Sequence, residues 1–361
     1  MRPLPERRRR AAALAATALL ALTACTGQAA DDPPDPNSAE FSAESLEGMR
    51  ILMGNDDSMR AAESDGSDGL GLYALRSRLC EAGADVVVFS PWGFQSSKSG
   101  AISHGGDTFS LGEPEAVPER CAGACQGAPS GGAVYGVCLD DSGQCAEGSP
   151  SATPVDAITF GVQYGLGELV GWEQGPDLVV SGVNSGPNLA SQIPTSGTFA
   201  VAEAAHNMGL PAIALSANVN EDLVVDPDTY DAAAGFGGEL VSYLEGSGVL
   251  TSDYVVSVNY PDAPDGEQVS DLRFTEAGTG TVLVGEYEED GGAYTMSARI
   301  CEEGREFCRP EEKGNSDFTA TFAEGAVSVS ALSGDRTYGS AEYDEDSSRL
   351  RELIEYLDSE R

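Results

Sequence analysis

The stretch RILMGNDD (residues 50–57) is the part of this chain that decides its fold, because an apolar run ends there abruptly in an acidic pair. Three runs of the same kind follow: DVVVF (residues 85–89), DLVVS (residues 177–181) and PAIAL (residues 211–215). A strand that is apolar at nearly every position, rather than at alternate positions, is typical of a parallel sheet covered on both faces. The four runs therefore predict a buried, mostly parallel sheet.

Helical patterns separate these runs. They occupy the ranges 71–83, 153–170, 198–208 and 229–244. Strands that alternate with helices form βαβ units, whose crossovers place helices on the faces of the sheet. The chain is therefore expected to have an α/β fold with a Rossmann-like three-layer core, in which residues 254–258 supply a further strand.

The remaining segments are expected to extend this core. Beyond Pro261, Gly-punctuated and β-rich stretches run to about Leu332 and predict an antiparallel extension, and residues 347–357 have the pattern of a terminal amphipathic helix. Residues 107–150 are rich in Gly, Pro and Ser and show little periodicity, which predicts a loop-like surface insertion. One domain over residues 48–361 accommodates all of these parts, with the C-terminal extension and helix from about residue 262.

The N-terminus has the pattern of an export signal over residues 1–24. A basic run, residues 7–10, precedes an apolar segment, residues 11–22, and Cys25 follows small residues as the lipidated cysteine of a lipobox does. The alternative is ordinary cleavage that leaves Cys25 free. The polar, Pro- and Asp-rich residues 25–47 cannot bury enough apolar surface to fold and predict a disordered tether. Together these features predict an exported cell-membrane lipoprotein that faces the extracytoplasmic side.

The chain is strongly acidic, with 59 Asp and Glu residues against 20 Lys and Arg residues and a formal net charge of −39. Such a field repels polynucleotides and anionic membrane surfaces, so nucleic-acid binding is disfavoured and the membrane is expected to be reached through the lipid anchor only. A small anionic substrate would need a local cation, which favours a metal site. The alternative is that the acidic excess serves solubility, for instance in a high-salt habitat.

The cysteines fit an oxidising compartment. Four lie in the Gly-rich insertion: Cys121, Cys125, Cys138 and Cys145. Cys301 and Cys308 flank a predicted hairpin tip, and Cys80 lies in a helical pattern. We expect two disulfides within the first group, with the pairing open, one disulfide in the second group, and a free buried Cys80. A zinc site is the rival interpretation, but the spacings match no common zinc motif.

Oxygen-bearing side chains follow three of the predicted strands. Asp56 and Asp57 end the first strand, Ser96 lies a few residues beyond the second, and Asn184 follows the third. Ligands of open parallel sheets bind at the carboxyl ends of the strands, where such side chains converge. Carboxylate, hydroxyl and amide oxygens suit a hard divalent ion, so we expect Mg²⁺ or Mn²⁺ there. The alternative for the acidic pair is ordinary surface charge.

Two Gly- and Ser-containing loops could hold an anion beside that metal. The loop of residues 181–188 ends in Asn188 and contains glycines that let a ligand approach the backbone. Ser196, Gly197 and Thr198 precede a helix, so their hydroxyl and N–H groups can cap the helix, bind a phosphate, or do both. The combination suits a phosphate held against a metal ion.

A catalytic Ser-His-Asp arrangement is not indicated. The chain has no Gly-x-Ser-x-Gly turn to present a nucleophile. It has only two histidines, His104 and His206, of which the second lies inside a predicted helix and is expected to be structural. Metal-assisted chemistry is therefore favoured over a covalent serine intermediate.

These motifs, in this order, resemble the SurE family of metal-dependent nucleotidases, also described as survival-protein acid phosphatases. The resemblance covers residues 49–216, with weaker similarity at residues 258–261 and 325–337. The matching motifs are residues 51–57, 71–79, 90–103, 153–156, 176–188 and 196–198.

The resemblance implies a divalent ion bound by Asp56, Asp57, Ser96 and Asn184. It also implies hydrolysis of nucleoside 5′- or 3′-monophosphates and related phosphomonoesters, and assembly into homodimers or tetramers. The metal would activate a water molecule that one carboxylate of the acidic pair orients or deprotonates. The substrate would be held by Asn55, Asn188, Ser196, Gly197 and Thr198.

The chain also departs from the family pattern. Ser58 replaces the usual Gly after the acidic pair, and Thr195 stands where an aromatic residue or His is common. The Cys-rich insertion and the lipid anchor are atypical. These departures leave a rival hypothesis, a non-catalytic nucleotide- or metal-binding surface lipoprotein with the same fold.

Overall fold

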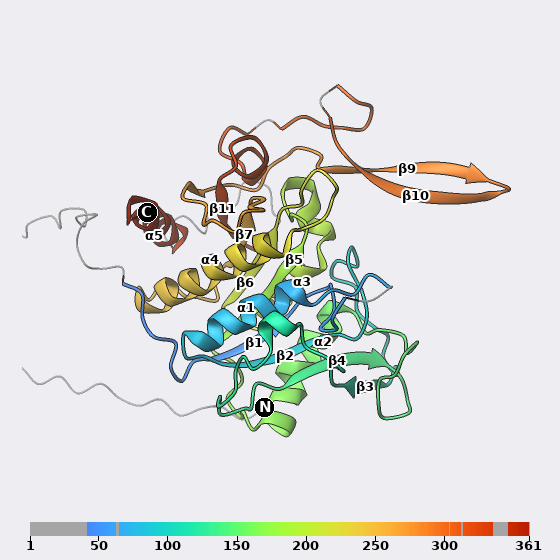
Figure 1. Cartoon of the computed structure of the whole chain (residues 1–361), viewed down its shortest axis with the longest axis vertical. Coiled ribbons are helices and arrows are strands. Elements are labelled where there is room, and N and C mark those ends of the chain that lie inside the picture. The colour runs from blue at the N-terminus through green and yellow to red at the C-terminus, as the bar shows by residue number, and fades with distance from the viewer. Residues whose placement is uncertain (1–41, 63–64, 303, 312, 335–345, 361) are drawn as a thin grey trace, which may run out of the picture. The chain divides into compact units, whose positions relative to one another are not determined.

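A nine-stranded sheet forms the centre of the computed structural model, which describes residues 42–62, 65–302, 304–311, 313–334 and 346–360 (Figure 1). The strand order is β3-β4-β2-β1-β5-β6-β7-β11-β8. The strands of this sheet are β1 (Arg50–Gly54), β2 (Asp85–Pro91), β3 (Phe109–Gly112), β4 (Val134–Leu139), β5 (Leu178–Ser185), β6 (Ala212–Ala217), β7 (Val255–Tyr260), β8 (Leu272–Phe274) and β11 (Val327–Leu332).

The six central strands, β4 to β7 in the sheet order, are parallel to their neighbours. In register, Ile51 of β1 lies between Val86 of β2 and Leu178 of β5. The chain builds the sheet in one direction from β1 through β2 to β4, and then in the other direction through β5, β6 and β7. The order therefore reverses between β1 and β5, which is where open α/β sheets bind their ligands.

Helices cover both faces of the sheet, which confirms the predicted three-layer core. Helices α1 (Leu70–Glu81) and α4 (Pro227–Gly246) pack against each other and against β5 on one face. Helix α2 (Pro154–Phe160), with its π-helical continuation η2 (Gly161–Val170), and α3 (Gly197–Asn207) pack on the other. The terminal helix α5 (Asp346–Glu360) packs on β8 and β11 (Figure 1).

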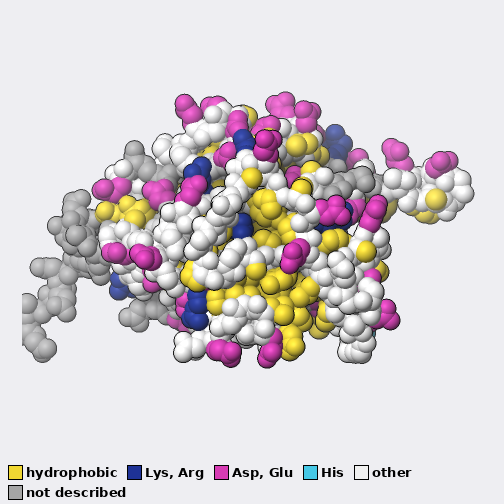
Figure 2. All heavy atoms as spheres, turned by 60° about the horizontal axis from the view of Figure 1, so that its bottom comes forward, with side chains coloured by type: hydrophobic (Ala, Val, Ile, Leu, Met, Phe, Trp, Pro, Cys, Tyr) yellow, Lys and Arg dark blue, Asp and Glu magenta, His cyan; other side chains and the backbone are white. Residues whose placement is uncertain are grey.

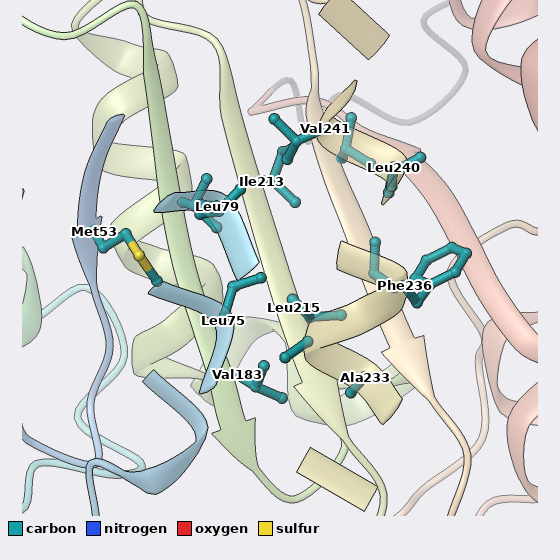
Figure 3. Packing of buried hydrophobic residues seen from close by; sticks show 14 of the residues in the cluster. Met53, Leu75, Leu79, Val183, Ile213, Leu215, Ala233, Phe236, Leu240 and Val241 are labelled. Carbon is teal, nitrogen blue, oxygen red and sulfur yellow. The ribbon is translucent and has the colours of Figure 1, made fainter. Parts of the chain in front are cut away.

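Side chains that alternate along each strand supply the two apolar layers. Ile51 and Met53 point into the layer beneath α1 and α4, whereas Leu52 points into the layer beneath α2 and α3. Figure 3 shows the first of these layers, where Leu75 of α1 and Phe236 of α4 lie over strands of the sheet. Because both faces are covered, the strands are apolar throughout, as the sequence indicated.

Helices α2 and α3 begin at residues whose side chains cap them. The Thr153 side chain accepts a hydrogen bond from the Asp156 N–H at 3.1 Å, the Asp156 carboxylate accepts one from the Thr153 N–H, and Pro154 occupies the first turn of α2. The Ser196 hydroxyl caps α3 by accepting a hydrogen bond from the Phe199 N–H at 2.9 Å. These caps fix the N-terminal end of α3 beside the carboxyl ends of β1 and β5.

The insertion departs from the predicted irregular loop. Strand β4, within residues 107–150, pairs in parallel with β2, and β3 pairs antiparallel with β4, so the insertion widens the central sheet. Gly136 interrupts the apolar segment VYGVCL of β4, and half of its residues, Gly136, Val137 and Cys138, are buried.

The predicted disulfide pattern is wrong in one respect. Cys80 on α1 pairs with Cys125, and Cys121 is left as a buried free thiol. The other pairs are Cys138–Cys145 and Cys301–Cys308, the latter as predicted. The last turn of α1 brings the Cα atom of Cys80 to 5.2 Å from that of Cys125, a proximity that depends on tertiary packing and not on chain spacing.

The C-terminal extension is largely antiparallel, as predicted. Strands β9 (Leu283–Asp290) and β10 (Ala293–Ile300) form a separate hairpin, and β11 pairs antiparallel with β7, although β8 pairs in parallel with β11. On the face shown in Figure 2, Asp and Glu side chains surround a central apolar area and outnumber Lys and Arg. Across the described ranges, no helix has the length and apolarity required to span a bilayer. The predicted export signal, Cys25 and most of the tether lie outside the described residues.

Candidate active site

A cavity of about 190 Å³ opens at the carboxyl ends of β1 and β5, where the strand order reverses. Five of the predicted site residues line it, and four of them come from the ends of two strands and from two loops: Asp56, Ser96, Asn184 and Asn188. Ser196, from the N-terminus of α3, lines it as well. The topology therefore brings together side chains that are up to 140 residues apart in the chain.

Asp56 is the carboxylate that lines this cavity, and it is almost completely buried, with 2% of its surface exposed. Its Oδ1 atom accepts a hydrogen bond from the Thr198 hydroxyl at 2.5 Å, and its Oδ2 atom accepts one from the Gly197 N–H at 3.1 Å. A Cβ atom at position 197 would lie 2.6 Å from Asp56 Oδ2, so glycine is required for this close approach. The helix N-terminus thus holds a carboxylate of the protein itself.

Asn184 completes a cluster of three oxygen atoms. Its Oδ1 atom lies 3.0 Å from the Thr198 hydroxyl, which also contacts Asp56. Its Nδ2 atom donates to the Gly186 carbonyl at 2.6 Å, and this hydrogen bond orients the amide oxygen toward Thr198. A hydroxyl has one proton for these two acceptors, so the cluster has more lone pairs than donors.

Asp57 does not line the cavity. Its Oδ2 atom accepts a hydrogen bond from the Ser185 N–H at 2.8 Å, next to Asn184, and it is as buried as Asp56. Among the described residues that line the cavity, Asp56 is present and Asp57 is absent. The adjacent carboxylates therefore have different surroundings, and Asp57 ties the end of β1 to the end of β5.

Burial raises the pKa of both carboxyl groups. For Asp56 the hydrogen bonds from Thr198 and Gly197 oppose this effect in part. For Asp57 the pKa is raised well above the usual range, first by burial and then by the negative charge of Asp56. Two neighbouring buried carboxylates repel each other, and a bound cation would remove this repulsion.

The donor set fits a hard divalent cation. Carboxylate, amide and hydroxyl oxygens from Asp56, Asn184 and Ser96 meet at the cavity, and these are the ligand types of Mg²⁺ or Mn²⁺. In the part of the chain that the structure describes, no group of three or more His, Cys, Asp or Glu side chains is arranged to hold a metal ion. The surplus of acceptors in the Asp56–Thr198–Asn184 cluster is the observation that favours a cation.

The residues predicted to bind phosphate divide into two groups. Ser196 and Asn188 line the cavity, whereas Gly197 and Thr198 are absent from its described lining and instead hold Asp56. Asn55 is fully buried; its Oδ1 atom accepts from the Ser90 hydroxyl at 2.8 Å. Its Nδ2 atom has no acceptor among the described residues, so it is a free buried donor beside Asp56.

One wall of the cavity is apolar. It combines side chains of the 218–226 loop, the base of the β9–β10 hairpin and a segment before β11. The residues are Val219, Leu223, Val282, Leu283, Ala298, Ile300 and Phe322. The cavity therefore has a polar end with oxygen and nitrogen atoms and an apolar wall that would accept an uncharged group.

Two residues of the site were not predicted, Ser216 at the end of β6 and Asn259 at the end of β7. The Asn188 amide donates to the Ser216 hydroxyl at 2.8 Å, and the Asn188 N–H donates to Asn259 Oδ1 at 2.7 Å. Both residues are buried polar side chains at the carboxyl ends of parallel strands. The rule that identified Asn184 could therefore have identified them.

The family model described as survival protein SurE matches residues 51–282. The chain belongs to the SurE family. It is 30% identical over 293 residues to the 5′-nucleotidase SurE of Pseudoalteromonas atlantica, an alignment that covers 80% of this chain and 94% of the relative. It is 30% identical over 302 residues to the 5′-nucleotidase SurE of Phenylobacterium zucineum, with 82% and 95% covered.

The SurE protein of Aquifex aeolicus has a similar fold. Its crystal structure superposes with a TM-score of 0.55 at 22% sequence identity and covers 83% of this chain and 99% of that one. The resemblance inferred from the motifs is thus confirmed. SurE nucleotidases are phosphoric monoester hydrolases, so membership of the family also confirms the predicted enzyme class.

Proposed function

We propose that this SurE-family chain is a metal-dependent phosphomonoesterase that hydrolyses nucleoside 5′- or 3′-monophosphates and related phosphate esters. The observation that carries the proposal is that Asp56 and Asn184 line a cavity at the switch point of the sheet, and that the Thr198 hydroxyl behind them contacts both side chains. The relatives from Pseudoalteromonas and Phenylobacterium, which align over most of their length, are named 5′-nucleotidases.

Asp56, Asn184 and Ser96 would hold the divalent ion, Mg²⁺ or Mn²⁺. When bound, such an ion supplies Lewis acidity toward a phosphoryl oxygen and lowers the pKa of water. The Asp56 carboxylate orients the attacking water and accepts its proton, while the Gly197 N–H and the Thr198 hydroxyl keep this carboxylate in place. Asp57 holds the Ser185 end of β5 and acts on the site through the backbone.

The polar end of the cavity suits the phosphate group. The Ser196 hydroxyl and the Asn188 amide line it, whereas Asn55 is completely buried and does not line the cavity. A phosphate would otherwise be repelled by a chain with a net charge of −39, so neutral donors and a cation are both needed. The attacking water would displace the alkoxide opposite to it, and the leaving alcohol would take a proton from solvent.

The apolar wall suits the leaving group. Val219, Leu223 and Ile300 offer aliphatic surface to the sugar and to the face of a base. A nucleoside monophosphate combines an anionic phosphate with a flat, largely uncharged base. The polar end of the cavity suits the phosphate, and the apolar wall suits the base. This match favours a nucleotide over inorganic phosphate or a sugar phosphate.

The rival hypothesis, a non-catalytic binding lipoprotein, is not favoured. It rested on Ser58, which replaces the usual Gly, and on the remodelled loops. The Ser58 hydroxyl donates to the Trp92 carbonyl at 2.8 Å and so supports the turn after Asp57. The altered turn is therefore compatible with an intact acidic pair.

The location and the assembly are further parts of the proposal. We infer export and lipidation at Cys25 from the basic and apolar N-terminal segments. A homodimer or tetramer is proposed from the family resemblance, and the large exposed side chains of the hairpin, Tyr287, Tyr294 and Met296, support it.

The test compares the mature protein with Asp56→Asn on adenosine 5′-monophosphate and a chromogenic phosphate ester, with Mn²⁺ or Mg²⁺. We expect Asp56→Asn to lower kcat/KM by about a hundredfold or more. Glu288→Gln is the matched control, since Glu288 belongs to an acidic pair on the exposed hairpin. Equal rates for all three proteins, or no phosphate release with any divalent ion, would reject the proposal.

A further inference from the structure

A buried carboxylate joins the C-terminal extension to the loop that follows β5. Asp317 has 1% of its surface exposed. Its Oδ2 atom accepts a hydrogen bond from the Ala190 N–H at 3.2 Å, and its Oδ1 atom accepts hydrogen bonds from the N–H groups of Gly278 and Phe318 at 2.8 and 2.7 Å. One side chain thus connects three segments that are distant in sequence.

The segment it reaches is under conformational constraint. Ala190 has a φ of +43°, in the left-handed region that residues with a Cβ atom rarely adopt. Such a conformation persists only when the surroundings hold it. Asn188, two residues earlier, lines the cavity and is also held by Ser216 and Asn259, so the conformation at Ala190 contributes to how Asn188 is presented.

Further contacts attach the same loop to the extension. The Ser191 hydroxyl accepts a hydrogen bond from the Val282 N–H at 3.1 Å, and Leu189 and Val282 share a small buried apolar cluster. A Cβ atom at Gly278 would lie 2.9 Å from Asp317 Oδ1, so the backbone packs directly on the carboxylate. The extension is therefore fastened to the cavity-lining loop and is more than an appended hairpin.

We propose that Asp317 is a positioning residue for the phosphate side of the cavity, which holds residues 188–190 in the conformation that presents Asn188 to substrate. This inference rests on the proposed function, because it assigns Asn188 a contact with the phosphate ester. Asp317 acts through the backbone of Ala190 and not on the reacting atoms.

The charge state of Asp317 is compatible with this role. Burial raises its pKa to about 6, the three backbone donors oppose this effect, and the charge of Glu311 adds to it. At neutral pH the group is therefore an anion that accepts all three hydrogen bonds. The charged neighbours on the same segment are Glu311 and Lys313, and Lys313 pairs with Glu276 at 3.2 Å.

Asp317→Asn is the selective test. The amide oxygen can replace Oδ1, which serves two donors, so the NH₂ group faces the Ala190 N–H and that hydrogen bond is lost. We expect the KM for adenosine 5′-monophosphate and the inhibition constant of inorganic phosphate to rise about five- to tenfold, with kcat changed by less than about twofold.

Glu311→Gln is the matched control. Glu311 is also a carboxylate of the extension, and it accepts backbone hydrogen bonds from Thr279, Gly280 and Lys313 within the extension. We expect it to lower thermal stability while its KM stays within about twofold of the wild-type value. An unchanged KM in folded Asp317→Asn, or an equal rise in both variants, would overturn the proposal.

Hydrogen exchange provides a readout that does not depend on activity. The amides of residues 188–191 should exchange at least about tenfold faster in Asp317→Asn than in the wild type, and not in Glu311→Gln. Should Asp317→Asn fail to fold, Ser191→Ala removes the Val282 contact and should give a smaller rise in KM and in exchange. Unchanged exchange would refute the role of Asp317, whereas absence of hydrolysis in the wild type would refute the proposed function alone.

Discussion

Thr198 donates a hydrogen bond of 2.5 Å to Asp56, across 142 residues of chain, and the same hydroxyl lies 3.0 Å from Asn184. The sequence predicts that Thr198 caps a helix or binds a phosphate. In the structure it connects a carboxylate at the end of β1 with an amide at the end of β5. Its hydroxyl is therefore expected to set the spacing of the two proposed metal ligands.

Replacement of Thr198 by Val keeps the shape of the side chain and removes the hydroxyl. We expect the apparent affinity for Mn²⁺ to fall about tenfold, as is typical when a hydrogen bond to a metal ligand is lost. The measurement is a Mn²⁺ titration of phosphate release, together with calorimetry. Thr198→Ser retains the hydroxyl and should stay close to wild type; a Val variant with unchanged Mn²⁺ affinity would contradict the assignment.

Leu223 tests the apolar wall of the cavity. It is about half exposed and has a φ of +61°, in a loop where Asn220 accepts hydrogen bonds from the Asp222 and Val224 N–H groups. Leu223→Asn should raise the KM for adenosine 5′-monophosphate about fivefold, because a partly buried leucine contributes about 1 kcal/mol of apolar burial. Steady-state kinetics give the value.

The comparison substrate is a small alkyl phosphate, whose alcohol is too short to cover the wall. Its KM should change by less than about twofold in Leu223→Asn. Leu223→Met keeps apolar surface and should resemble the wild type with both substrates. A similar rise for both substrates would mean that Leu223 supports the loop and does not contact the leaving group.

Much of the core could be predicted because its strands are apolar at nearly every position. The stretch of residues 50–57 contains strand β1, and the carboxyl-end rule pointed to Asp56 and Asn184. The roles of Gly197 and Thr198 toward Asp56 could not be predicted, because a helix N-terminus offers the same donors to a ligand and to a carboxylate of the protein. The sequence identifies the hydrogen-bond donors at the start of the helix, whereas tertiary packing determines which acceptor they bind.

Ser58 illustrates a departure from the family pattern that the structure explains. It has a φ of +78°, where glycine is favoured, and its hydroxyl donates to the Trp92 carbonyl. Ser58→Ala keeps the strain and loses the hydrogen bond, so we expect it to lower the free energy of unfolding by about 1–2 kcal/mol. Ser58→Gly loses the same bond but relieves the strain and should be the milder change. Urea denaturation would decide, and a Gly variant less stable than the Ala variant would contradict this account.

The disulfide pairing predicts that two of the disulfides stabilise the protein to different extents. Cys80 and Cys125 are 45 residues apart, and Cys138 and Cys145 are 7 apart. From loop-closure entropy, we expect replacement of both cysteines of the first pair by Ser to lower the free energy of unfolding by about 4 kcal/mol. The same replacement in the second pair should lower it by about 2 kcal/mol. Urea denaturation measures both. Peptide mapping should find Cys80 linked to Cys125, with Cys121 alkylated only after unfolding; a Cys121–Cys125 link would refute the pairing.

The raised pKa of Asp317 predicts how stability depends on pH. The folded-state pKa is about 6, above the value of about 4 for an exposed Asp, so the folded protein binds one more proton than the unfolded chain between these values. Its contribution to stability is therefore fully present below about pH 4 and is lost as the pH rises through 6, by at most about 3 kcal/mol. The free energy of unfolding of the wild type, minus that of Asp317→Asn, should be larger at pH 4.5 than at pH 7.

The contribution of Glu311 to stability should depend on pH in the opposite way. This contrast distinguishes the titration of one carboxyl group from a general effect of acid on the protein. The pKa of Glu311 is lowered to about 2, against burial, by hydrogen bonds from Lys313, Gly280 and Thr279. The contribution of Glu311 to stability is present above about pH 4, near the pKa of Glu in the unfolded chain, and is lost as the pH falls toward 2. Urea denaturation of both variants across pH 3 to 7 measures the two differences. If the difference for Asp317→Asn were flat or grew from pH 4 to 7, the carboxyl group would not be the buried acceptor that the Ala190 contact requires.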